Sequence, residues 1–312
     1  MPKYLTVTGE IRKEDLGITL IHEHILVDFV GAALSGPDRY VRDEVVKRAL
    51  PFLTDLVDLG CSTFVDCTPA YPGRDVQLLQ QLSIQTGLNI LTNTGYYGAV
   101  DGKYLPKFAF SESAGQLAQR WILEAEKGID DTGIKPGFIK IGVNKGPLNA
   151  VDRKLVEAAA ITHLATGLTI SSHTGDGKAA LEQIHILQAN GVHADAFRWV
   201  HAQNEKDTLL HLEAAGQGAW VEFDGISEKS AEQHFEFISN MKSHNFLDHC
   251  LISQDSGWYH VGEENGGNYN DYNYIFDHFI PLLKHKDFEQ KEIDLLLFDN
   301  VARSLGIYPR KN

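Results

Sequence analysis

Residues 17–28 read GITLIHEHILVD, a short run of β-branched and aliphatic residues that contains two histidines and one acid. This composition predicts a buried β-strand. Because side chains alternate along a strand, we expect His22 and His24 on one face and Glu23 on the other. In the helical His-Glu-x-x-His motif, by contrast, the acid shares the site with the histidines. By itself the pair does not distinguish metal ligands from two ordinary strand histidines.

Runs of the same kind recur along the chain, and most are followed by an amphipathic stretch typical of a helix. Near-continuous apolar strands that alternate with helices indicate a parallel sheet covered on both faces. Eight such units predict a (β/α)₈ barrel, an α/β fold, as a single domain over residues 1–312. The alternative is an open doubly wound sheet, but no Gly-x-Gly-x-x-Gly follows a strand. The predicted strands are residues 18–26, 62–68, 89–97, 137–143, 168–174, 197–202, 219–225 and 249–257.

Composition narrows the classes of partner. The net charge of -14 argues against a nucleic-acid partner or an anionic membrane surface. No apolar run reaches transmembrane length, and the start MPKYLTVTGE has no signal-peptide core. The three cysteines form no disulfide framework, so we expect a reducing, cytoplasmic compartment. The partner that we expect is a small-molecule substrate.

Polar residues stand at the ends of several predicted strands. Active sites of barrels lie at the carboxyl ends of the strands, so these side chains are expected to converge. Imidazole and carboxylate groups are the ligands that zinc and related ions prefer. The convergence, unlike the opening pair, is a specific signal for a metal site. The residues are His22 and His24 on the first strand, Lys140 on the fourth, His173 on the fifth, His201 on the sixth and Asp255 on the eighth.

Lys140 is the least expected of these residues, because a buried, unpaired ammonium group costs several kcal/mol. One explanation is a lysine that extends to the strand end beside a carboxylate. A second is a Schiff-base lysine with a lowered pKa, which would make the protein an aldolase-like lyase. A third is a lysine carboxylated by carbon dioxide, which bridges two metal ions. The histidines around the same mouth favour the third explanation.

Together these motifs resemble the phosphotriesterase family of the amidohydrolase superfamily, including its lactonases. The matching pieces are HEH at 22–24, GFIKIGV at 137–143, SSHT at 171–174, WVHAQN at 199–204 and ISQDSGW at 252–258. The resemblance implies a distorted barrel, a homodimer and two divalent ions, with zinc expected and Mn²⁺, Co²⁺ or Fe²⁺ as alternatives. By position, it implies that His22, His24 and Asp255 hold the buried ion and that His173 and His201 hold the exposed one. Lys140, as N6-carboxylysine, and a hydroxide would bridge them.

The same resemblance implies a mechanism, in which the bridging hydroxide attacks the substrate and Asp255 takes the proton. Glu23 lies on the opposite strand face and is expected to be structural, as is Asp66 on the second strand. The family's phosphotriesterases carry a His, and its acyl-homoserine lactonases an Arg, where this chain has Gly225. A partner carboxylate is replaced by Asn204. We therefore expect no outer proton relay, which disfavours paraoxon-like triesters and long-chain lactones.

Aromatic residues are the candidate substrate contacts. Tyr97 matches a tyrosine that lines the site in the family's lactonases. Trp258, Tyr259 and His260 follow Asp255 by three to five residues, in a loop over residues 256–278 that we expect to act as a substrate lid. Aromatic and amide groups suit a hydroxylated ring such as a sugar lactone. No arginine cluster is apparent near a strand end, which disfavours a phosphorylated substrate.

The leading hypothesis is thus a binuclear-metal hydrolase that opens a small lactone or related carboxylic ester. Hydrolysis of phosphotriesters or phosphodiesters at the same site is the alternative within this chemistry. A Schiff-base lyase that uses Lys140 and a non-catalytic metal-binding barrel are the alternatives from other classes.

Overall fold

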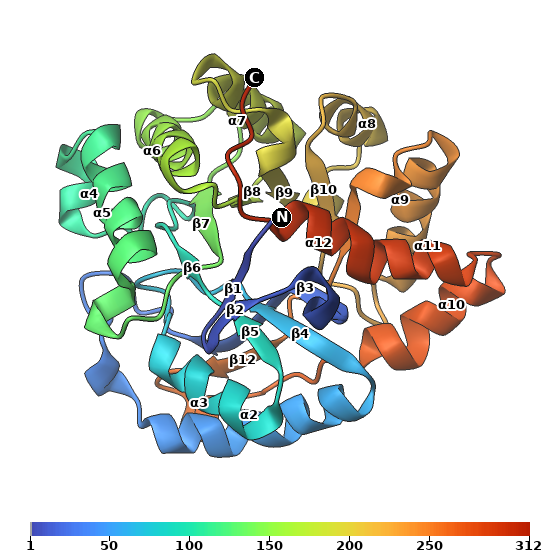
Figure 1. Ribbon diagram of the computed structural model, residues 1–312, viewed down its shortest axis with the longest axis horizontal. Helices are drawn as coiled ribbons and strands as arrows, with labels where there is room; N and C mark the ends of the chain where they lie inside the picture. The colour runs from blue at the N-terminus through green and yellow to red at the C-terminus, as the bar shows by residue number, and fades with distance from the viewer. Residues whose placement is uncertain (1) are drawn as a thin grey trace.

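The computed structural model describes residues 2–312 and consists of a ring of parallel strands enclosed by helices (Figure 1). The predicted (β/α)₈ barrel is therefore confirmed. No helix in residues 2–312 is long and apolar enough to cross a membrane. The barrel strands are β3 (Ile18–Val27), β4 (Cys61–Asp66), β5 (Asn89–Leu91), β6 (Asn93–Thr94), β7 (Phe138–Val143), β8 (Ile170–Thr174), β9 (Phe197–Val200), β10 (Trp220–Phe223), β11 (Cys250–Ile252) and β12 (Gly257–His260).

Helices follow the strands and cover the outside of the ring, as the amphipathic stretches predict. The α-helices are α1 (Lys13–Leu16), α2 (Arg42–Asp58), α3 (Val76–Thr86), α4 (Lys107–Ser111), α5 (Ala114–Lys127), α6 (Ala150–Thr166), α7 (Gly177–Ala189), α8 (Thr208–Gly216), α9 (Ala231–Ser243), α10 (Ile280–His285), α11 (Gln290–Asp294) and α12 (Asn300–Leu305). The short helices are η1 (Pro37–Arg39), η2 (Ile129–Asp131), η3 (Ala194–Ala196), η4 (Ala202–Asn204), η5 (Leu247–His249), η6 (Glu264–Gly266), η7 (Ile275–Phe279) and η8 (Leu295–Asp299).

The ring closes through two interrupted strands. Six strands pair in the order β11-β10-β9-β8-β7-β6, and four in the order β12-β3-β4-β5. Only Thr92 separates β5 from β6, and residues 253–256 separate β11 from β12. At the second break the backbone N–H of Asp255 donates to His22 O at 3.1 Å, and that of His24 donates to Ser256 O at 3.0 Å. The eighth strand thus meets the first beside the histidine pair.

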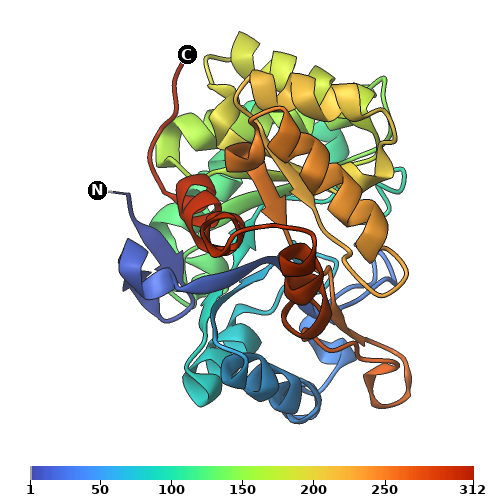
Figure 2. The same cartoon turned by 90° about the vertical axis from the view of Figure 1, so that its right-hand side faces the viewer.

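One end of the barrel is plugged by the N-terminal hairpin β1 (Tyr4–Thr6) and β2 (Gly9–Ile11) together with α12, as two perpendicular views show (Figures 1 and 2). Tyr4 Oη donates to Ala302 O at 3.0 Å. Tyr4 belongs to an apolar cluster inside the ring that also contains Ile21, Val65 and Phe138. Apolar side chains of this cluster therefore occupy much of this end of the barrel.

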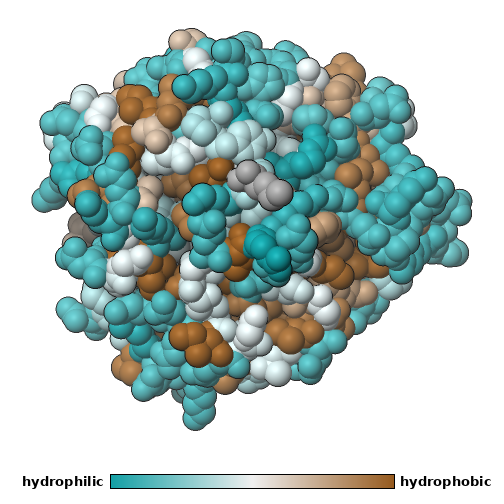
Figure 3. Space-filling model, viewed as in Figure 1, coloured by the Kyte–Doolittle hydropathy of each residue, from teal (hydrophilic) through white to brown (hydrophobic). Residues whose placement is uncertain are grey.

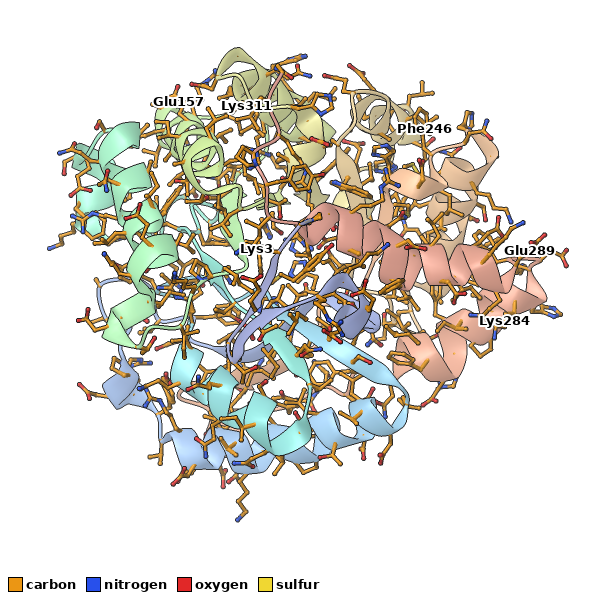
Figure 4. All side chains as sticks on the ribbon, viewed as in Figure 1. Lys3, Glu157, Phe246, Lys284, Glu289 and Lys311 are labelled. Atoms are coloured by element: carbon orange, nitrogen blue, oxygen red, sulfur yellow. The ribbon has the colours of Figure 1, made fainter. Side chains whose placement is uncertain are left out.

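A second, larger core lies between the strands and the helices. Side chains fill this layer, while charged residues such as Glu157, Lys284 and Glu289 lie at the periphery (Figure 4). On the face shown in Figure 3, hydrophilic residues separate smaller hydrophobic areas. The helices therefore bury one side and expose a polar one, which is what their sequence pattern predicts.

Candidate metal centre

His22 and His24 lie next to each other inside the barrel, with 5.3 Å between their ring centroids. The pairing of β3 with β4 shifts register between Leu20 and Glu23, so the strand is irregular where the histidines stand. His24 Nδ1 lies 2.7 Å from Thr68 Oγ1, which leaves Nε2 directed at Asp255. Burial lowers the pKa of His24 to about 4, so its imidazole is neutral and able to bind a metal.

Asp255 is held in a left-handed backbone conformation, with φ of 52°, at the break in the eighth strand. Its Oδ1 atom lies 3.0 Å from His24 Nε2 and 3.7 Å from His22 Nε2. Burial by itself raises the pKa of Asp255, but the contact with His24 and the charge on His22 outweigh it and hold that pKa below its usual value. The carboxylate is therefore ionised at neutral pH.

His173 and His201 form a second neighbouring pair, with 4.4 Å between their ring centroids. His201 follows β9 with φ of 62°, and its backbone N–H donates to Asp224 Oδ2 at 3.0 Å. Its Nδ1 contacts the other oxygen of the same carboxylate. His22 joins the two pairs, since its ring centroid is 5.1 Å from that of His201. Burial, followed by the charge of His201, lowers the pKa of His173 well below its usual range.

Lys140 is 2% exposed on β7, and its Nζ atom has no hydrogen-bond partner within residues 2–312. A lysine extended beside a carboxylate, the first of the three explanations, does not fit this arrangement. A buried amine with no acceptor is costly, whereas a carboxylated lysine would bring two oxygen ligands to the histidines. The residues present thus fit a binuclear centre.

Two groups of three side chains could each hold an ion, because within each group the ligand atoms lie within 4.8 Å of one another. One, with His22, His24 and Asp255, is the set expected for the buried ion. The other combines His22 and His201 with Asp224, which was not among the predicted ligands. Asp224 also accepts from Gln203 Nε2 at 2.8 Å, so both of its oxygens are engaged by side chains and backbone. We interpret Asp224 as the residue that orients His201. Its place at the end of the seventh strand was the signal available for finding it.

Glu23 and Asp66 have the structural roles expected of them. The fully buried Glu23 carboxylate accepts from Ser253 Oγ at 2.8 Å and from the backbone N–H of Ser256 at 2.7 Å. These bonds hold the segment that carries Asp255. Burial raises the pKa of Glu23 to about 8. Asp66 accepts from the backbone N–H groups of Ile25 and Thr68 and so joins the ends of the first two strands.

An aromatic row stands around the mouth of the barrel. Tyr97 has its ring centroid 4.9 Å from that of His173, and Trp258 has its centroid 4.8 Å from that of His24. His260 stacks against Trp258 at 6.1 Å. Of the four predicted substrate contacts, Tyr97 and Trp258 therefore lie beside the histidines, and His260 lies against Trp258.

Two residues that the sequence analysis missed complete this row. Phe29, which is 40% exposed, lies 5.6 Å from Trp258 and 6.2 Å from Tyr104 between ring centroids. Tyr104 in turn lies 5.7 Å from Tyr97. Both residues come from loops after strands, where no periodic pattern indicates which side chain points inward. We call Phe29, Tyr97, Tyr104, Trp258 and His260 the aromatic row.

Tyr259 does not belong to this row, contrary to the sequence-based expectation. It is 6% exposed, and its ring packs so closely against Gly266 that a Cβ there would lie 2.3 Å from the ring. Tyr259 is the central residue between Trp258 and His260 on β12, and alternation turns it to the outer face.

The loop over residues 256–278 is only partly free to act as a lid. Tyr269 and Tyr272 are buried, their hydroxyl groups lie 2.6 Å apart, and Tyr272 Oη donates to His24 O at 2.7 Å. This part of the loop packs as core and fixes the strand that carries the histidine pair. The lid expectation is therefore wrong for Tyr269 and Tyr272.

Asn204 is exposed, and Gly225 carries no side chain. Neither residue can carry protons, as expected from the sequence. Two arginines, Arg42 and Arg74, are among the residues that line a cavity of about 500 Å³. Arg42 and Arg74 at this cavity are already paired with Asp75 and Glu124. These guanidinium groups are engaged by carboxylates, so they do not contradict the expectation that no arginine cluster stands near a strand end.

Comparisons with known proteins agree with this geometry. A model described as the phosphotriesterase family matches residues 2–305. The phosphotriesterase homology protein of Escherichia coli K12 is 30% identical, over 92% of this chain and 97% of that protein. A phospho-furanose lactonase of Mycoplasmopsis synoviae is 27% identical, over 98% and 92%. A triple mutant of an organophosphorus hydrolase from Deinococcus radiodurans superposes with a TM-score of 0.88, at 25% identity and 98% coverage of both chains.

Proposed function

This chain belongs to the phosphotriesterase family, and we propose that it is a binuclear-metal hydrolase whose substrate is a small lactone, with a sugar lactone as the leading candidate. The observation that carries the proposal is the convergence of four histidines, Lys140 and Asp255 at one end of the barrel. The relatives named as lactonase and organophosphorus hydrolase support cleavage of an ester bond.

We assign the ligands as the sequence suggests. His22, His24 and Asp255 would hold one ion, and His173 and His201 the other. Lys140, carboxylated, would supply oxygen ligands to the centre. When bound, two such ions, with zinc expected, would activate water and polarise the bond under attack.

The protein groups have separate tasks in this scheme. Thr68 and Asp224 fix the orientation of His24 and His201 through their Nδ1 atoms. Asp255, which is ionised and close to both His22 and His24, accepts the proton of the attacking water. Glu23 holds the segment around Asp255 so that its carboxylate stays in reach.

The aromatic row supports a ring-shaped substrate. Flat aromatic faces pack well against a small lactone ring, and the phenol groups of Tyr97 and Tyr104 offer hydrogen bonds to its hydroxyl groups. Hydrolysis of a phosphoester remains the second candidate, because the superposed organophosphorus hydrolase shares the fold.

We further propose that residues 1–312 form one catalytic domain and that the protein is a homodimer. The cysteines Cys61, Cys67 and Cys250 are unpaired and buried, which fits a reducing compartment such as the cytoplasm.

The test is a panel of sugar lactones, simple aliphatic lactones and phosphotriesters, assayed with protein loaded with Zn²⁺ or Mn²⁺ and with chelator-treated protein. We expect metal-dependent opening of lactones and little or none in an Asp255→Asn control. Two bound ions with no hydrolysis across the panel would favour a non-catalytic barrel. Borohydride trapping of a carbonyl compound on Lys140 would favour a lyase.

A further inference from the structure

A charged pair lies inside the barrel directly behind His22. Arg198 on β9 and Glu222 on β10 are both fully buried. Glu222 Oε1 lies 2.7 Å from His22 Nδ1, and Glu222 Oε2 lies 4.0 Å from Arg198 Nη1. The Arg198 guanidinium also lies over the ring of Phe138, 4.9 Å from its centroid. Arginine, glutamate and histidine therefore form a line from the barrel core to the metal centre.

This pair is difficult to explain by stability. The interior of such barrels is normally filled by branched apolar residues. Within residues 2–312, no nitrogen of the Arg198 side chain has a hydrogen-bond partner, and neither has Glu222 Oε2. Burying two charges with so few hydrogen bonds commonly stabilises a fold less than apolar residues of similar volume would. A role at the metal centre explains why charges stand at these positions.

We propose that Glu222 and Arg198 are positioning residues for His22, an inference that rests on the proposed metal-dependent function. Glu222 accepts the Nδ1–H bond of His22 and thereby selects the tautomer whose Nε2 lone pair faces Asp255. Arg198 supplies the counter-charge for the buried carboxylate, which water would provide at the surface.

Glu222 positions only one of the histidine ligands, His22. His24 Nδ1 contacts the hydroxyl group of Thr68, and His201 Nδ1 contacts Asp224. Asp224 also lies 3.4 Å from His22 Nδ1, farther than Glu222 does. Loss of Glu222 should therefore weaken the ion held by His22 and leave the ion held by His173 and His201 nearly unchanged.

The experiment uses Glu222→Leu, Arg198→Met and the double variant. Each metal-free protein is titrated with Zn²⁺ against a chelating competitor, and its thermal midpoint is measured without metal. In Glu222→Leu, which removes the acceptor for His22 Nδ1, we expect the affinity for one of two ions to fall by roughly 10–100-fold, the usual loss when a partner of a ligand is removed. Arg198→Met should lower the thermal midpoint, because it leaves a carboxylate buried without its counter-charge.

The double variant separates positioning from stability. It should recover much of the thermal midpoint lost in Arg198→Met, since both charges are gone, yet keep the weak Zn²⁺ affinity. Arg74 and Glu124 give a matched control: their side chains pair at 2.7 Å and touch no histidine. Glu124→Gln should change the midpoint and leave both affinities as they were.

The outcomes are distinguishable. Two ions bound by Glu222→Leu with the affinities of the unmodified protein would overturn the positioning role and leave the proposed function standing. The role is also overturned if the double variant regains affinity along with its midpoint, or if Glu124→Gln loses affinity equally. An unmodified protein that binds no Zn²⁺ would overturn the proposed function and this inference together.

Discussion

His24 Nε2 lies 3.0 Å from Asp255 Oδ1, although the two residues come from the first and last strands of the barrel. The contact exists because β12 pairs with β3, with Gly257 opposite His24. A Cβ at Gly257 would lie 2.0 Å from His24 O, so only glycine allows the two strands to approach this closely. The candidate metal centre is therefore assembled by closure of the ring.

The purified protein should contain about two divalent ions per chain, as expected for a binuclear site. Removing them with a chelator should lower the thermal midpoint, because ions bind the folded state and stabilise it by mass action. His24→Ala should lose the buried ion and most activity. Elemental analysis of desalted protein measures the content. His244→Ala, at an exposed histidine, is the control and should retain both ions.

Lys140→Ala should bind metal poorly and lose most of its activity. Its buried Nζ has no hydrogen-bond partner in the described chain, which fits an amine that carries a carboxyl group. The substitution removes that amine and, with it, the carboxylate ligand. Added formate or acetate should partly restore both metal content and turnover by supplying a carboxylate. Lys145→Ala, in the exposed loop after β7, should behave as the unmodified protein does. Crystals of metal-loaded protein with an unmodified Lys140 would contradict the carboxylation.

Asp255→Asn should keep much of its metal, because an amide oxygen still coordinates, but lose about 10²–10⁴ in turnover, the range for a missing general base. Asn204→Ala should cost far less, since Asn204 is exposed and an amide does not shuttle protons. Turnover and metal content of both variants decide the matter. Equal losses with metal retained in each would mean that the proton takes another route.

Trp258→Ala should raise KM for a ring-shaped lactone by roughly two- to tenfold, since an aromatic contact contributes about 0.5–1.5 kcal/mol. Its ring stands beside His24 at the mouth. Tyr259→Phe should leave KM unchanged, because Tyr259 packs against Gly266 on the outer face. Steady-state kinetics on both variants test the assignment, which fails if Tyr259→Phe has the larger effect.

Part of the acid sensitivity of the fold should come from His163. This residue is fully buried and its Nε2 accepts from the backbone N–H of Arg310 at 2.8 Å. Burial lowers the pKa of His163 below the usual value for a histidine, about 6.5. Below pH 6.5 the unfolded chain therefore binds more protons than the folded chain, and this stabilising contribution is lost as the pH falls.

His163→Gln removes the imidazole that binds this proton in the unfolded chain. The difference in unfolding free energy between the unmodified protein and the variant should shrink as the pH is lowered from about 7 to 5. Urea unfolding of metal-free protein at each pH measures it, since metal binding also depends on pH. Parallel stability curves for the two proteins would rule out this source of acid sensitivity.

Some of this molecule is determined by local sequence. The alternation of apolar runs with amphipathic stretches predicts the barrel, because periods of 2.0 and 3.6 residues are properties of a strand and a helix by themselves. Parallel strands in a closed ring bring their carboxyl ends together, so the placement of His22, Lys140 and Asp255 at one mouth follows from the same pattern.

Other features depend on contacts between distant segments. Whether Trp258 or Tyr259 faces the mouth depends on the register in which β12 pairs with β3. The contact of His22 with Glu222 depends on the ring placing the first and seventh strands around one interior. Phe29 enters the aromatic row from a loop, where neither period applies. The sequence by itself determined the strands, the helices and the polar residues at the strand ends. Only tertiary structure decided the partners of those residues, because pairing register and loop path are set by packing between distant parts of the chain.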